Sequence, residues 1–239
     1  MQNPNPIIVA LDVPDAARAI ELAEQLSPHV GALKIGKELF TAVGPEIVRR
    51  LRAAGARVFL DLKFHDIPNT VAGAVRAAAR LDVQMLTLHT AGGSAMMRAA
   101  VQAAGEMAQA TGTEPPLLLG VTVLTSMDPA ALEETGVPGP VEQQVERLAR
   151  LAIEAGLPGL VCSPQELRLL RAVLPAEVQL VTPGIRPASA ALGDQKRVMT
   201  PAEAMAAGAN WLVIGRPITG AADPAIAARQ ILEEIRSGG

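Results

Sequence analysis

Short apolar runs alternate with longer amphipathic stretches along almost the whole chain of 239 residues. A continuous apolar run of four to eight residues is typical of a strand buried on both faces, as in a parallel sheet. Strand followed by helix recurs about eight times at roughly 30 residues per unit, which predicts an α/β fold. The predicted strands are Ile7 to Leu11, Ala32 to Ile35, Arg57 to Leu62, Gln84 to Leu88, Leu117 to Leu124, Gly159 to Cys162, Val178 to Val181 and Trp211 to Ile214.

The stretches between these strands have helical apolar spacing. Their number and the chain length match a (β/α)8 TIM barrel, for which about 250 residues is typical. Hydrophobic residues make up 49% of the chain and no linker divides it, so we predict one domain over residues 1–239. A doubly wound open sheet is the alternative, although no glycine-rich fingerprint follows the first strand. The predicted helices are Pro14 to Leu26, Glu38 to Ala54, Thr70 to Leu81, Ser94 to Ala110, Val141 to Ala155, Gln165 to Val173, Pro201 to Ala207 and Pro224 to Ile235.

The composition argues against several classes of protein. A net charge of -3 and an aromatic content of 2% give no basis for binding nucleic acid. The single cysteine, Cys162, excludes an internal disulfide and lies in an apolar run, where it is expected to be a small buried hydrophobic residue. The first residues lack the pattern of a secretory leader, and no apolar run is long enough to span a membrane. We therefore expect a cytoplasmic protein.

The densest group of charges lies where the third predicted strand ends. Asp61 and Lys63 are two residues apart and so point to the same face of that strand. Asp66 lies beyond the strand end, where a turn can bring it back towards Lys63. A lysine flanked by carboxylates keeps its proton, which favours a fixed cation and proton donor over a Schiff-base lysine. The alternative is an ion pair on the solvated rim of the barrel.

Other polar residues also fall at predicted strand ends, where (β/α)8 barrels place their active sites. Each has a structural alternative: Asp12 can cap the first helix, and Lys34 can extend from the rim to water. For His65 and His89 we favour structural roles. Only four of the 21 basic residues are lysines, which favours a role for a compact ammonium where one occurs; the alternative is chance. The residues at the strand ends are Asp12, Lys34, Asp61, Lys63, His89, Thr125, Ser126, Arg186, Gly215 and Arg216.

The last two units have the features of a phosphate site. Gly215 permits close approach of the backbone, and Arg216 follows it with a guanidinium that suits a dianion. Phosphates commonly bind after strands 7 and 8 of this fold. The loop from Arg186 to Arg197 is long, rich in small residues and carries Gln195, so we expect a lid that closes over the phosphate. The alternative is an ordinary surface loop.

Several segments together resemble the orotidine 5′-phosphate decarboxylase family over nearly the whole chain. The most specific is the Asp-x-Lys-x-x-Asp pattern within residues 61–70, whereas the Ile-Gly-Arg-Pro segment is shared more loosely by phosphate-binding barrels. The matching segments are Ala10-Leu11-Asp12, Leu33-Lys34-Ile35-Gly36, Asp61-Leu62-Lys63-Phe64-His65-Asp66-Ile67-Pro68-Asn69-Thr70, Leu124-Thr125-Ser126, Pro183-Gly184-Ile185-Arg186-Pro187, Gly193-Asp194-Gln195 and Val213-Ile214-Gly215-Arg216-Pro217-Ile218.

The resemblance implies decarboxylation of orotidine 5′-phosphate to uridine 5′-phosphate in pyrimidine biosynthesis, without metal or organic cofactor. It implies a homodimer in which Asp66 and Thr70 complete the partner's site, and a lysine, Lys63, that protonates C6 of the pyrimidine. The implied residues are Lys34, Asp61, Lys63 and Asp66 as the charged tetrad; Asp12, Lys34, Asp61 and Thr70 near the ribose; Ser126 at the pyrimidine, with Thr125 in the same segment; and Gln195, Gly215 and Arg216 at the phosphate, with Arg186 at the base of the closing loop.

Two other functions remain open on the residues alone. The first is another barrel enzyme acting on a sugar phosphate, either an aldolase or an epimerase that uses His65, His89, Asp61 and Asp66 as metal ligands. The second is a barrel that binds a nucleotide phosphate without turnover. Chelator sensitivity distinguishes the metal-dependent enzyme, and product binding without turnover distinguishes the inactive barrel.

Overall fold

Eight parallel strands form a closed barrel, with each strand paired to the next and β8 paired to β1. The computed structural model describes residues 5–187 and 199–238. Closure confirms the predicted (β/α)8 barrel, and the open doubly wound sheet is wrong. The strands are β1 (Ile7–Ala10), β2 (Ala32–Gly36), β3 (Val58–Phe64), β4 (Met85–His89), β5 (Leu117–Val121), β6 (Gly159–Val161), β7 (Gln179–Thr182) and β8 (Trp211–Ile214).

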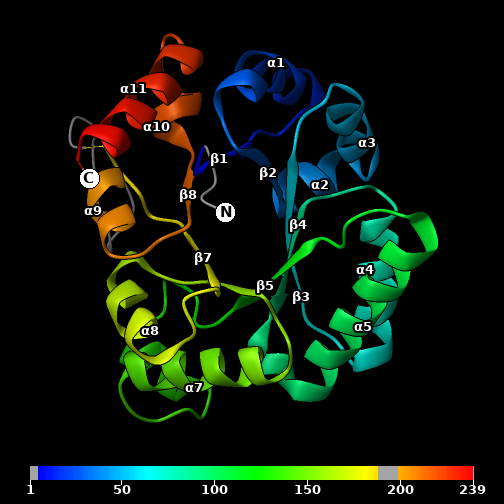
Figure 1. The fold of residues 1–239 in the computed structure, drawn as a ribbon, viewed down its shortest axis with the longest axis vertical. Coiled ribbons are helices and arrows are strands. Elements are labelled where there is room, and N and C mark those ends of the chain that lie inside the picture. The colour runs from blue at the N-terminus through cyan, green and yellow to red at the C-terminus, as the bar shows by residue number, and fades with distance from the viewer. Residues whose placement is uncertain (1–4, 188–198, 239) are drawn as a thin grey trace.

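Helices form a ring around the strands (Figure 1). In the described part of the chain, no helix is long and apolar enough to cross a membrane. The helices are α1 (Ala16–Leu26), η1 (Ser27–His29), α2 (Lys37–Val43), α3 (Glu46–Ala53), α4 (Pro68–Ala79), η2 (Thr90–Gly92), α5 (Gly93–Thr111), α6 (Pro129–Glu134), α7 (Val141–Glu154), η3 (Pro164–Glu166), α8 (Leu167–Val173), α9 (Pro201–Ala206), α10 (Arg216–Thr219) and α11 (Pro224–Ser237).

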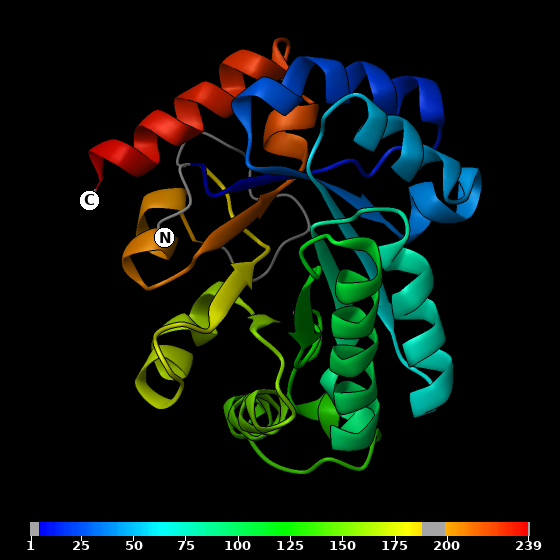
Figure 2. The same ribbon diagram turned by 45° about the vertical axis from the view of Figure 1, so that its right-hand side comes forward.

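The strands have two buried faces, because side chains alternate along each strand. One face packs against the ring of helices and forms the larger core, to which Leu60, Leu86 and Leu88 belong. Figure 2 shows α1 and α11 covering one side of the strands and α4 and α5 covering another. The other face fills the barrel interior with a smaller cluster that includes Phe59 and Trp211. Interior side chains closer to the end of the barrel do not belong to this cluster, and they can form a site there.

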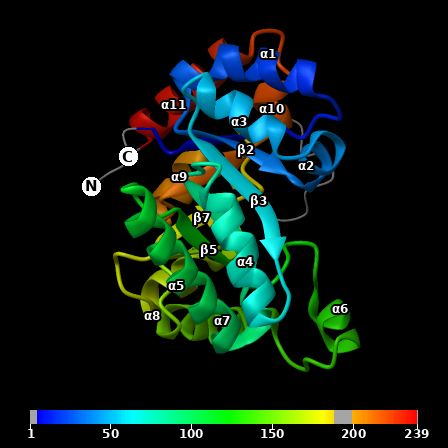
Figure 3. The ribbon, with the colours of Figure 1, turned by 90° about the vertical axis from the view of Figure 1, so that its right-hand side faces the viewer.

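Three local features differ from the sequence prediction. The predicted helix from Glu38 to Ala54 is two helices, because Gly44 has a φ of 75° and Pro45 follows it. Strand β5 ends at Val121, so the predicted strand to Leu124 is too long. The proline-rich passage contains α6, which begins with Asp128 as its N-cap and Pro129 in its first turn. Figure 3 shows α6 standing off from the ring of helices.

Arg171 on α8 joins the last two strands at the amino end of the barrel. Its guanidinium donates to the backbone carbonyls of Gly208 and Val178, each at 2.8 Å, and to the side-chain oxygen of Asn210. The same Asn210 oxygen accepts the backbone N–H of Leu180 at 2.7 Å. One side chain of α8 thus satisfies polar groups in the segments just before β7 and β8, which holds these elements together.

Arg171→Met should lower the free energy of unfolding by about 2–3 kcal/mol, because several carbonyl and amide oxygens lose a charged donor. Urea unfolding of the variant and wild type measures the difference. Arg168→Met, an exposed position on the same helix, is the control and should change stability by less than about 0.5 kcal/mol. Equal stability of the two variants would show that the Arg171 network contributes nothing.

Candidate active site

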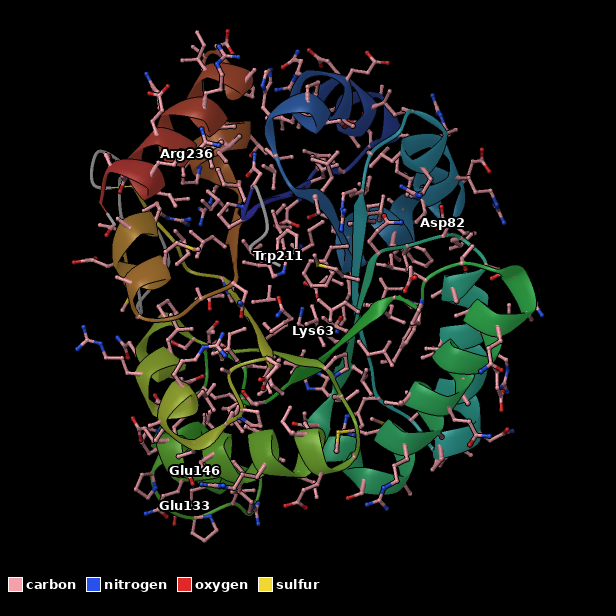
Figure 4. The ribbon with its side chains drawn as sticks, viewed as in Figure 1. Lys63, Asp82, Glu133, Glu146, Trp211 and Arg236 are labelled. Atoms are coloured by element: carbon pink, nitrogen blue, oxygen red, sulfur yellow. The ribbon has the colours of Figure 1, made fainter. Side chains whose placement is uncertain are left out.

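A cavity of about 560 Å³ opens at the carboxyl ends of the strands. This is the end at which (β/α)8 barrels carry their active sites. Lys63 lies near the middle of the ring of helices in Figure 4, whereas Arg236 and Glu146 lie on its outside. Eight of the residues predicted from the sequence line the cavity: Asp12, Lys34, Asp61, Lys63, Thr125, Arg186, Gly215 and Arg216.

Four of these side chains form a continuous series of alternating charges, which we call the charged chain. Lys34 Nζ lies 3.0 Å from Asp12 Oδ1 and 3.7 Å from Asp61 Oδ2. Lys63 Nζ donates to Asp61 Oδ1 at 2.7 Å. The Asp61 side chain is 13% exposed, so these contacts lie in a partly dehydrated site where charges interact strongly. Three successive strands, β1 to β3, therefore bring Asp12, Lys34, Asp61 and Lys63 together.

The environment keeps Asp61 ionised. Burial alone raises the pKa of its carboxyl group, but the charges of Lys34 and Lys63 outweigh burial, and the pKa lies below its ordinary value of 3.8. Hydrogen bonds from Lys63 and Thr87 act in the same direction. Asp61 is consequently a carboxylate at neutral pH, fixed between two ammonium groups.

Glycine at two positions leaves room at the site, one beside the charged chain and one in the cavity wall. A Cβ atom at Gly36 would lie 3.0 Å from Lys34 Nζ and 3.2 Å from Asp12 Oδ1, so a side chain there would crowd the first pair of the charged chain. A Cβ atom at Gly215 would meet no protein atom closer than Ala10 Cβ at 3.6 Å. The space beside Gly215 is thus empty of protein and faces the cavity, which leaves room for a ligand next to Arg216.

The rest of the cavity wall is largely apolar and faces the charged chain. Phe59, Val121, Val123 and Val161 line it, together with the buried thiol of Cys162. Burial raises the pKa of this thiol to about 12, so it is inert as a nucleophile at neutral pH. A cavity with an apolar wall, a row of charges and an arginine at one end suits an elongated molecule that carries a ring and an anionic group.

Three predicted residues lie outside this cavity. The Asp66 carboxylate accepts the backbone N–H of Ile67 at 2.6 Å and forms no salt bridge with the described residues. The expectation that a turn returns Asp66 to Lys63 is therefore wrong within one chain. Thr70, at the start of α4, and Ser126, after β5, are exposed at the same end of the barrel. Gln195 and most of the loop that we expected to be a lid lie outside the described residues.

Thr87 is a buried residue at the site that the sequence analysis missed. Its hydroxyl oxygen accepts the backbone N–H of Lys63 at 2.9 Å and donates to Asp61 Oδ1 at 3.0 Å. The signal was present in the alternation of β4, which places Thr87 on the same interior face as Met85. A polar residue at an interior position of an otherwise apolar strand could have identified it.

The two histidines near the site lie beside each other with their rings tilted by 41°, and they do not line the cavity. The ring centroids of His65 and His89 are 5.5 Å apart. Burial lowers the pKa of His89 to about 4, and the charges of His65, Lys63 and Lys37 add to the effect. His89 is therefore neutral at pH 7. Within residues 5–187 and 199–238, no group of three His, Cys, Asp or Glu side chains is arranged to hold a metal ion.

Comparisons with known proteins agree on one family. The sequence model of the "Orotidine 5'-phosphate decarboxylase / HUMPS family" matches residues 5–231. An orotidine 5′-phosphate decarboxylase from Moorella thermoacetica is 57% identical over 230 residues, which cover 96% of this chain and 91% of that relative. Another from Halorhodospira halophila is 55% identical over 241 residues and covers both chains completely. The crystal structure of the enzyme from Lactobacillus acidophilus has a TM-score of 0.87 at 38% identity and covers 97% of this chain and 99% of its own.

The low pKa of His89 predicts a loss of stability in mild acid. Below the ordinary pKa of 6.5 the unfolded chain takes up a proton at this residue, whereas the folded protein does so only near pH 4. Stability should therefore fall as the pH decreases from 6.5 to 4. His89→Gln should reduce the loss between pH 7 and pH 5 by about 1 kcal/mol, allowing for partial exposure. Urea unfolding at both pH values and one protein concentration tests this; an unchanged loss in the variant would contradict it.

Proposed function

The chain belongs to the orotidine 5′-phosphate decarboxylase / HUMPS family, and on that premise we propose that it is a carboxy-lyase that converts orotidine 5′-phosphate to uridine 5′-phosphate and CO2. The observation that carries this proposal is the charged chain, which holds the ammonium of Lys63 against Asp61 at the cavity wall. The hydrogen bond from Lys63 Nζ to the Asp61 carboxylate favours a lysine that acts as an ammonium and argues against a Schiff-base lysine.

The chemistry requires a cation at the carbon that loses CO2. Cleavage of the bond between C6 and the carboxylate leaves the electron pair on C6, where the pyrimidine ring does not readily delocalise it. The ammonium of Lys63 stabilises this developing charge and then transfers a proton to C6. Lys63 regains its proton from solvent after the product leaves. Asp61 keeps the ammonium in place throughout, and we propose that no metal or organic cofactor takes part.

The remaining predicted residues would orient the substrate along the cavity. Asp12 and Lys34 lie 3.0 Å apart and present a carboxylate and an ammonium that suit ribose hydroxyls. The opening beside Gly215 and the guanidinium of Arg216 suit the phosphate, as does the buried Arg186. We assign the same role to Gln195, and we assign Ser126, which follows Thr125 in the same segment, to the pyrimidine. Binding energy from the phosphate, remote from C6, then supports the reaction.

A second copy of the chain would complete each site. Asp66 and Thr70 are exposed at the cavity end of the barrel, and Ile67 between them is 66% exposed, an unusual value for a large apolar side chain. A two-fold symmetric dimer that covers Ile67 would carry Asp66 into the partner's cavity. We propose that Asp66 thereby becomes the second carboxylate beside Lys63, and that Thr70 approaches the ribose.

We also propose that the chain is one catalytic domain that works in the cytoplasm. The match to the family extends over residues 5–231 and leaves few residues outside it. The only cysteine, Cys162, is free and buried, as is common for proteins of a reducing compartment.

Replacement of Lys63 tests the reaction and the proton donor. Wild type should decarboxylate orotidine 5′-phosphate in the presence of EDTA, followed by the change in ultraviolet absorbance. Lys63→Ala should reduce kcat by at least about 10⁴-fold, since both charge stabilisation and the proton are lost. Lys63→Arg should also be severely impaired, because a guanidinium retains its proton.

Three results would contradict the proposal in different ways. Absence of turnover by folded wild type that still binds uridine 5′-phosphate would indicate a barrel that binds nucleotides without catalysis. Loss of wild-type activity in EDTA alone would indicate a metal-dependent reaction. Near wild-type activity of Lys63→Ala would remove Lys63 as the proton donor and leave the reaction itself intact.

The shared site can be tested by mixing two inactive variants. Lys63→Ala and Asp66→Ala should each be nearly inactive alone. In a mixed dimer, one site combines Lys63 from one chain with Asp66 from the other and is intact. Random reassociation should therefore restore about a quarter of wild-type sites. Activity that stays at the level of the separate variants would show that Asp66 does not act in the partner's site.

A further inference from the structure

Thr87 on β4 connects the backbone of one functional residue to the side chain of another. It is completely buried, and its hydroxyl is used in both directions, as acceptor from Lys63 N–H and as donor to Asp61. It does not line the cavity. Any effect of Thr87 on the reaction must therefore act through Asp61 and Lys63 rather than through contact with the substrate.

The strand pairing explains why a side chain is needed at this point. Leu60 pairs with Leu86, but the next pair is Phe64 with Leu88, so β3 contains two more residues than β4 over the same interval. Such an irregularity interrupts the ladder of backbone hydrogen bonds. The N–H of Lys63 lies within the interrupted part, and it donates to the Thr87 hydroxyl instead.

The backbone at Lys63 has an unfavourable conformation. Its φ is 53°, and within the described residues only Asp82 shares a positive φ among residues other than glycine. A lysine adopts this left-handed region only when its surroundings hold it there. The extra residues of β3 and the bond to Thr87 meet at this position, and the conformation directs the Lys63 side chain to Asp61 and the cavity.

We propose that Thr87 is a positioning residue for the reaction: its hydroxyl fixes the left-handed backbone of Lys63 and the carboxylate of Asp61 in one arrangement, and so aims the Lys63 ammonium at the reacting carbon. The proposal rests on the proposed decarboxylase function. A small misplacement of the proton donor weakens catalysis strongly but changes binding of the remote ribose and phosphate little. Thr87 should therefore affect kcat far more than KM.

Two variants at Thr87 separate the role of its hydroxyl group from that of its methyl group. Thr87→Val keeps the shape of the side chain but removes the acceptor for Lys63 N–H and the donor to Asp61. Thr87→Ser keeps the hydroxyl and loses only a methyl group. Thr90→Val is the control for placing valine at a buried threonine, because the Thr90 hydroxyl donates to the Val121 carbonyl at 2.9 Å and has no contact with the charged chain.

The experiment measures kcat and KM for orotidine 5′-phosphate with wild type and these three variants, and urea unfolding of each. We expect Thr87→Val to reduce kcat at least about tenfold with KM changed less than about threefold. Thr87→Ser should recover most of the lost kcat. Thr90→Val should keep wild-type kcat even where its stability falls as much as that of Thr87→Val.

Crystal structures of wild type and Thr87→Val provide a readout that does not depend on activity. We expect the variant to show a changed φ at Lys63 or a lost contact between Lys63 Nζ and Asp61. Wild-type turnover together with unchanged kcat in Thr87→Val would overturn the positioning role and leave the decarboxylase function standing. Absence of turnover by wild type would overturn the proposed function. In that case, an unchanged φ at Lys63 together with an unchanged contact between Lys63 Nζ and Asp61 in the Thr87→Val crystal would separately overturn the positioning role.

Discussion

The interaction on which the site depends is the pairing of one carboxylate, Asp61, with two ammonium groups. Burial of a single carboxylate is unfavourable, and burial of Lys34 beside Lys63 without it would place like charges together. With Asp61 between them the charges alternate, and Asp12 extends the series towards water. The pairing stabilises ionised groups that the apolar interior would otherwise neutralise. It also fixes the ends of three strands relative to one another.

The barrel supplies this pairing with rigid supports. Its interior cluster, with Phe59 and Trp211, fills the region beneath the cavity, and the outer core holds the alternate side chains Leu60, Leu62 and Phe64 of β3. The functional side chains therefore stand on strands rather than on loops alone, where their positions are well defined. The strand that carries both Asp61 and Lys63 is also the irregular one, with extra residues and a left-handed lysine. Strain is concentrated at the residue that we propose acts on the substrate.

The sequence predicted the fold well and the site in part, and the differences have local physical causes. The spacing and the length of the apolar runs predicted all eight strands to within a few residues, because a continuous apolar run reflects burial of both faces of a strand. The break at Gly44 and Pro45 was missed, since apolar spacing continues across it. Asp66 was expected to return to Lys63, but spacing along a chain does not fix the direction of a turn, and the carboxylate instead accepts the N–H of Ile67.

The sequence by itself determined which residues stand at the carboxyl ends of the strands, because alternation and apolar run length depend only on neighbouring residues. It also determined that Asp61 and Lys63 share a face. Only the tertiary structure decided that Lys34 pairs with Asp61 and that β3 has two more residues than β4 between the same paired positions. It also decided that the Thr87 hydroxyl accepts the backbone N–H of Lys63. These features join residues more than 20 positions apart, and their geometry depends on how the barrel closes, which no local pattern encodes.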